Sequence, residues 1–92
     1  MADPYEGRIK RQVVSKDGSR VQWFVTVTRP EWTSGVDGIG ASTLLHRGDS
    51  PEWVQSKRDT LRLTLLEHAD QNQLPIDGFD AYLAEFLQGV GA

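Results

Sequence analysis

Arg8, Lys10, Arg20 and Phe24 bring three cations and one aromatic ring into a short N-terminal stretch. Guanidinium and ammonium groups bind phosphate, and an aromatic side chain on a β-sheet can stack on a nucleic-acid base. Trp32 follows in a glycine-rich segment, and tryptophan is one of the side chains favoured at the centre of protein interfaces. These five residues are the binding site that the sequence predicts, for a protein partner or for a nucleic acid.

His46 and His68 are the only histidines, and neither belongs to a metal-ligand or catalytic motif. His68 follows Glu67 directly, but adjacent residues of a helix do not face each other. The chain has no cysteine, which excludes disulfides, thiolate ligands and cysteine nucleophiles. The segment GVDGIG at 35–40 lacks the Lys-Ser/Thr of a phosphate-binding loop, so we interpret it as a flexible loop. We therefore predict no catalytic residue, no metal site, no cofactor and no enzymatic activity.

The charged residues are spread unevenly along a chain of 92 residues whose net charge is −3. Residues 1–29 contain six Lys or Arg against three acids, and residues 49–92 contain three against eight. This asymmetry favours an oriented approach to a partner rather than a general nucleic-acid coat. No apolar run approaches the roughly 18 residues of a membrane span, and the N-terminus lacks a secretory pattern. We expect a cytoplasmic protein that does not enter a membrane.

The clearest local pattern is a β-hairpin over about residues 8–28, RIKRQVVSKDGSRVQWFVTVT. A two-residue turn at Asp17-Gly18 would mix basic side chains with the valines of the second strand. A three-residue loop with Gly18 in the left-handed region instead pairs Lys10 with Phe24. One face is then basic and polar around Phe24, and the other carries Arg11 among the apolar residues Ile9, Val13, Val21, Trp23, Val25 and Val27.

Three further elements are predicted after Pro30, which cannot donate to a sheet ladder and ends the second strand. Residues 41–46 form a short third strand. A long helix covers about residues 51–71, with Ser50 as its N-cap and Pro51 in its first turn. A C-terminal helix over about residues 78–89, with Asp77 as its N-cap, has the most regular apolar period of the chain: Phe79, Tyr82, Leu83, Phe86, Leu87 and Val90.

The predicted fold is one α+β domain over residues 1–92, in which a two- or three-stranded antiparallel sheet packs on the long helix. We expect residues 1–7 to form a flexible tail. The C-terminal helix is expected to cover the side of the long helix that faces away from the sheet. Alternatively, its apolar stripe contacts a second copy of the chain and forms a homodimer.

Residues 8–76 resemble the core of the HicB-type antitoxins. The resemblance depends on Gly48-Asp49-Ser50 and Glu52 at the start of the long helix and on Leu74-Pro75-Ile76 after it. It implies a degenerate RNase-H-like sheet and a non-catalytic scaffold that binds a protein partner, and it assigns no functional residue. The DNA-binding tail of that family has no counterpart here, because an amphipathic helix follows instead.

Two function hypotheses follow from these patterns. The first is a non-enzymatic interaction or regulatory module that binds a protein partner, and the second is a nucleic-acid-binding domain that uses the same basic face. The triplet Pro-Glu-Trp occurs twice, at residues 30–32 and 51–53, but in different contexts. We expect Trp53 to pack at the helix start and Trp32 to be available to a partner.

Overall fold

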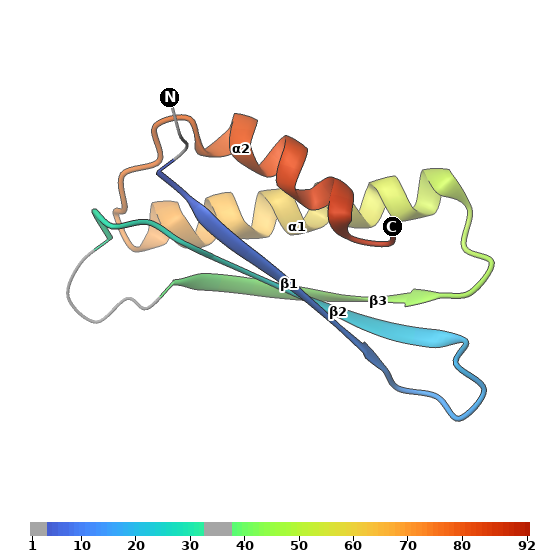
Figure 1. The fold of residues 1–92 in the computed structure, drawn as a ribbon. Coiled ribbons are helices and arrows are strands. Elements are labelled where there is room, and N and C mark those ends of the chain that lie inside the picture. Colours follow the sequence, from blue (N-terminus) through green and yellow to red (C-terminus); the bar gives the residue numbers. More distant parts are fainter. Residues whose placement is uncertain (1–3, 33–37) are drawn as a thin grey trace.

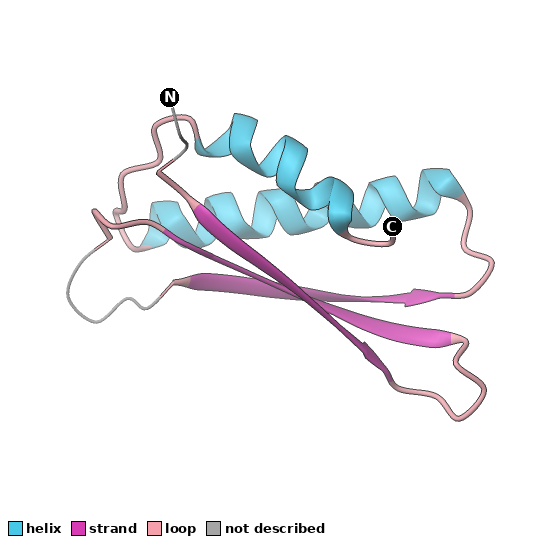
Figure 2. Cartoon of the chain, viewed as in Figure 1, coloured by secondary structure: helices cyan, strands magenta, loops and turns pink. Residues whose placement is uncertain are grey.

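The chain folds into a three-stranded antiparallel sheet with two helices on one of its faces (Figure 1). The computed structural model describes residues 4–32 and 38–92. The strands are β1 (Glu6–Val13), β2 (Arg20–Thr28) and β3 (Ile39–His46), in the order β1-β2-β3. The helices are α1 (Pro51–Gln71) and α2 (Phe79–Phe86), and a short 3-10 helix, Leu87–Gly89, continues α2. The predicted α+β class is confirmed, and Figure 2 shows both helices on the same side of the strands.

The β-hairpin has the predicted register, with Lys10 opposite Phe24. Its loop passes through Gly18 at φ 76°, in the left-handed region that glycine enters without strain. The Asp17 Oδ1 atom accepts hydrogen bonds from the Ser19 hydroxyl at 2.6 Å, the Ser19 backbone N–H at 3.0 Å and the Ser15 hydroxyl at 2.8 Å. These bonds, those from Ser19 above all, favour the ionised carboxylate and lower the pKa of Asp17 well below its usual range.

The third strand and the long helix occur where the sequence predicts them, although β3 begins at Ile39 rather than at residue 41. The helix α1 has the predicted N-cap, because the Ser50 hydroxyl accepts a hydrogen bond from the Trp53 backbone N–H at 3.1 Å. It lies over β3 and buries one stripe of its surface there: Leu61, Leu65 and Ala69. Neither helix of the described residues is long and apolar enough to cross a membrane.

The helix α2 lies beside α1 on the same sheet face and close to β1 (Figure 1). Gly7 of β1 is pressed against it, because a Cβ atom there would collide with the Phe86 ring and lie 2.5 Å from the Tyr82 hydroxyl. The prediction that this helix covers the far side of α1 is therefore wrong. The predicted cap is wrong as well, since the N-cap is Gly78 at φ 73° and not Asp77.

Most of the apolar stripe of the C-terminal helix is buried within the chain. Phe79, Leu83, Leu87 and Val90 are buried against the sheet and α1. Burial of such a stripe stabilises the fold, because each Å² of apolar surface removed from water contributes about 25 cal/mol. The other two members of the stripe, Tyr82 and Phe86, are half-buried, and a homodimer through this helix stays a prediction.

An aromatic cluster closes one end of the core and involves Tyr5, Trp32 and Phe79. The Tyr5 ring stacks on Phe79 with their centroids 4.9 Å apart, and Trp32 meets Phe79 edge-on at 5.5 Å. The Tyr5 hydroxyl donates to the Asp77 carbonyl at 2.8 Å and accepts from Arg29 Nη1 at 2.7 Å. Tyr5 is thus buried and β1 already begins at Glu6, which corrects the predicted tail for residues 4–7; residues 1–3 lie outside the described residues.

Candidate binding surface

Four of the five predicted site residues lie on the sheet face that the helices leave uncovered. Side chains alternate along a strand, so Arg8, Lys10, Arg20 and Phe24 point away from the helix-covered valines of β2. Lys10 lies directly opposite Phe24, at the separation of about 5 Å that is typical of cross-strand pairs. The structure therefore brings the predicted cations and the predicted aromatic ring to one surface.

We call this surface the outer face. Its residues form rows that run across the three strands. Each row consists of a residue of β2 and the residues opposite it on β1 and β3. The members of the outer face are Glu6, Arg8, Lys10, Gln12, Arg20, Gln22, Phe24, Thr26, Thr28, Gly40, Ser42, Leu44 and His46.

Phe24 occupies the middle of the outer face, on the central strand. Its opposite neighbour on β3 is Ser42, and in the adjacent row Gly40 lies opposite Thr26. Both β3 residues are small, and Leu44, which lies opposite Gln22, is the other diagonal neighbour of Phe24 on that strand. The Phe24 side chain remains 38% exposed, and a phenylalanine in this position offers a ring face to a planar ligand.

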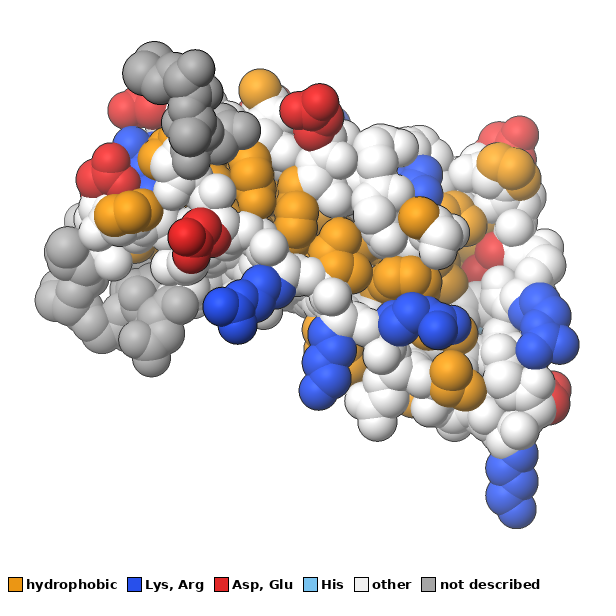
Figure 3. All heavy atoms as spheres, in the orientation of Figure 1, with side chains coloured by type: hydrophobic (Ala, Val, Ile, Leu, Met, Phe, Trp, Pro, Cys, Tyr) orange, Lys and Arg blue, Asp and Glu red, His pale blue; other side chains and the backbone are white. Residues whose placement is uncertain are grey.

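The charge of the outer face is mainly positive. Arg8, Lys10 and Arg20 outnumber one carboxylate, Glu6, which lies at the end of β1 opposite Thr28. None of these three cations forms an ion pair with a described residue. In Figure 3 most Lys and Arg side chains of the visible face lie on the strand side, and most acidic ones lie on the helix side. The molecule thus presents its sheet, rather than its helices, to a negatively charged partner.

A depression of about 280 Å³ adjoins one end of the outer face and is lined by Glu6, Arg8, Thr26 and Thr28. Hydroxyl groups and a guanidinium group line it, so it offers hydrogen-bond donors beside the Phe24 row.

Trp32 is not part of the outer face. It is only 5% exposed and its indole Nε1 donates to the Pro75 carbonyl at 2.9 Å. The expectation that Trp32 is available to a partner is wrong for this conformation, and the glycine-rich residues 33–37 that follow it lie outside the described residues. Trp53 shows the opposite: it is 48% exposed, with Lys57 Nζ 4.5 Å from the ring centroid. The prediction for Trp53 is therefore wrong as well: the sequence predicts a packed Trp53 and an exposed Trp32, and the structure has a buried Trp32 and a half-exposed Trp53.

Arg11 is the charged residue that the predicted register leaves on the core face. Its guanidinium carbon lies 5.7 Å from the centroid of the Trp23 ring, opposite it on β2. The cation therefore covers an aromatic face at the open end of the sheet, which explains how an arginine is tolerated there.

The site predicted from the sequence does not include the polar residues around Phe24. Gln12 and Gln22 pair across β1 and β2, Thr26 lies in the row adjacent to that of Phe24, and Ser42 lies opposite Phe24. Each can donate and accept hydrogen bonds. The hairpin register already places the first three on this face, but Ser42 requires the pairing of β2 with β3.

His46 and His68 lie apart, one at the end of β3 and the other near the end of α1. Within residues 4–32 and 38–92, no three His, Asp or Glu side chains are grouped so that they could hold a metal ion.

Comparisons with protein-family models, curated proteins and solved structures find no match to this chain. The surface is therefore interpreted from its own geometry.

Proposed function

We propose that the outer face binds single-stranded nucleic acid, with Phe24 stacking on a base and Arg8, Lys10 and Arg20 neutralising phosphates. The observation that carries the proposal is the exposed Phe24 ring in the centre of an uncovered, basic sheet face. Stacking on an aromatic side chain of an open sheet is a common way to bind unpaired bases.

Single strands are favoured over duplexes by the position of the ring. Phe24 stands on the central strand, between Lys10 and Ser42, and not at the tip of a projecting loop. A base must leave its stack to reach such a ring, which costs least when the strand is already unpaired. The neighbouring Gln and Thr side chains offer hydrogen bonds to base edges without requiring one sequence.

A protein partner is the second candidate function, and it is the one that the resemblance to HicB-type antitoxins implies. Val13 and Val14 favour it, because they are 49% and 46% exposed at the end of the edge strand β1. An edge strand with exposed valines can pair with another chain, including a second copy. Against it, the outer face without Trp32 is rich in charge, whereas the centres of protein interfaces are depleted of charge.

The test is fluorescence anisotropy of a labelled oligothymidylate over a salt series. We expect binding that weakens with salt and a slope that falls by about 0.7 for each phosphate contact removed. Arg8→Gln, Lys10→Gln and Arg20→Gln should each reduce both affinity and slope. Lys57→Gln on α1 removes the same charge outside the outer face and should change neither.

Two results would overturn this proposal. One is the absence of binding at low salt for both single- and double-stranded oligonucleotides. The other is equal loss of affinity in Lys57→Gln and Lys10→Gln, which would mean that only net charge matters. Light scattering on the same samples tests the second candidate, because pairing through β1 should double the mass and Val13→Lys should restore the monomer.

A further inference from the structure

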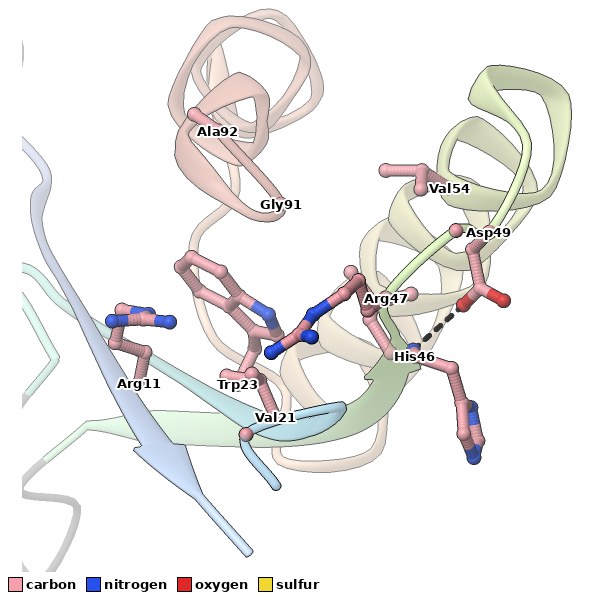
Figure 4. A pocket seen from close by; sticks show the side chains of 12 residues that line it. Arg11, Val21, Trp23, His46, Arg47, Asp49, Val54, Gly91 and Ala92 are labelled. Carbon is pink, nitrogen blue, oxygen red and sulfur yellow. Dashed lines mark hydrogen bonds between the residues drawn. The ribbon is translucent and has the colours of Figure 1, made fainter. Parts of the chain in front are cut away.

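We infer that a groove on the helix side of the sheet binds a small organic anion with a flat apolar body. The groove has a volume of about 430 Å³ and lies between the open end of the hairpin, the start of α1 and the C-terminal residues. This volume lies within the range of small-molecule sites. Figure 4 shows it from close by.

The groove has an apolar floor. Val21, Leu45 and Val54 line it together with the Trp23 ring, and these residues come from β2, β3 and α1. Trp23 is almost fully buried, so its position is fixed by packing rather than by a partner. A flat apolar group placed here would contact an indole and three branched side chains.

The groove is lined by two arginines, Arg11 and Arg47, and by one aspartate, Asp49. Arg11 and Arg47 line opposite sides of Trp23 in Figure 4, and neither forms an ion pair with a described residue. Arg47 is held in place by one hydrogen bond, from its Nη2 to the Asp17 carbonyl at 3.0 Å. The indole Nε1 of Trp23 makes no hydrogen bond within the described part of the chain.

The one acidic side chain that lines the groove does not neutralise these donors. Asp49 accepts a hydrogen bond from the His46 backbone N–H at 2.8 Å, and in Figure 4 the carboxylate points away from Trp23. Two guanidinium groups and an indole N–H over an apolar floor therefore fit a carboxylate or phosphate group on an aromatic or branched body. The inference is independent of the nucleic-acid proposal, because Arg11 and Trp23 point to the opposite side of the sheet from Phe24.

The experiment is an NMR titration that follows the three tryptophan indole N–H signals, with Trp23 assigned by its loss in Trp23→Phe. The probes are 3-phenylpropionate, phenyl phosphate and the neutral 3-phenylpropanamide. We expect the Trp23 signal to shift saturably with both anions, at dissociation constants of about 1 mM or below, and much less with the amide. The Trp32 signal should not move, since this side chain lies in the core.

Arg11→Gln and Arg47→Gln should each weaken anion binding by roughly tenfold, because each removes a charge-assisted hydrogen bond. Lys57→Gln, which does not line the groove, should bind as the parent does. The ratio of the two anion affinities identifies the preferred head group. Three results would overturn the inference. The first is an equal shift with the neutral amide, and the second is unchanged anion affinity in the variant that combines Arg11→Gln with Arg47→Gln. The third is no shift with either anion up to about 10 mM.

Discussion

The two faces of β2 have opposite roles although their residues alternate along the same nine-residue strand. Trp23, Val25 and Val27 point to the helices and are buried, whereas Phe24 and Thr26 point outward and stay exposed. The exposed aromatic ring is therefore not explained by the core. A single exposed apolar side chain is common on protein surfaces. Phe24 indicates a binding site because it lies among the cations of the outer face, with Lys10 directly opposite it.

The largest difference is expected between two tryptophans. Trp32→Ala should lower the free energy of unfolding by about 4 kcal/mol, because it removes a buried ring and leaves the Pro75 carbonyl without its donor. Trp53→Ala should cost less than about 1 kcal/mol, since the ring is half exposed and loses little beyond its contact with Lys57. Urea denaturation of both variants measures the difference. Equal losses would mean that Trp32 is not part of the core.

Two glycines give the next comparison. Gly7→Ala places a methyl group against Phe86 and Tyr82 on the covered face and should cost about 2 kcal/mol. Gly40→Ala on the outer face would place its methyl group 3.2 Å from the Val25 carbonyl oxygen and 3.8 Å from Thr26 Oγ1, and its effect should stay below about 1 kcal/mol. Thermal unfolding followed by circular dichroism measures both. A harmless Gly7→Ala would show that α2 does not press on β1.

Phe24→Ala should separate binding from stability. Affinity for oligothymidylate should fall by about tenfold, since one stacked base contributes roughly 1–3 kcal/mol. The free energy of unfolding should fall by about 1–2 kcal/mol, less than for a fully buried ring, because the Phe24 side chain is 38% exposed. Phe24→Tyr preserves a ring and should retain most of the affinity. A large loss of stability in Phe24→Ala would instead make this ring part of the core.

The smallest effect concerns pH at the hairpin loop. The pKa of Asp17 is lowered in the folded state, so its stabilising contribution is complete above the unfolded pKa of about 3.9 and is lost as pH falls toward the folded value. Wild type should therefore exceed Asp17→Asn in urea midpoint at pH 6, and the gap should narrow at about pH 2 to 3. A gap that widens in acid would contradict the hydrogen bonds from Ser15 and Ser19.

Much of the fold could be predicted from local rules. Gly18 determined the hairpin register, and Ser50 with Pro51 determined where α1 begins. These features depend on neighbouring residues, as do the faces of β1 and β2. The outer face could therefore be predicted with Arg8, Lys10 and Phe24 together.

The parts that could not be predicted depend on contacts between distant segments. Trp32 is buried by Tyr5 and Phe79, which lie 27 and 47 positions away along the chain. Because both partners come from other elements, nothing near Trp32 in the sequence distinguishes a core ring from an exposed one. The contact of α2 with β1 had the same cause, since Gly7 provides space that only the folded chain reveals.

The most direct test of the central claim is an NMR titration with short oligothymidylate at low salt, using protein labelled with ¹³C only at phenylalanine. The chain has three phenylalanines, and Phe79 and Phe86 lie on the helix side. The account predicts that the ring signals of Phe24 shift on binding while those of Phe79 and Phe86 remain in place, because only Phe24 can stack on a base. Binding that leaves the Phe24 signals unchanged, or no binding at all, would contradict it.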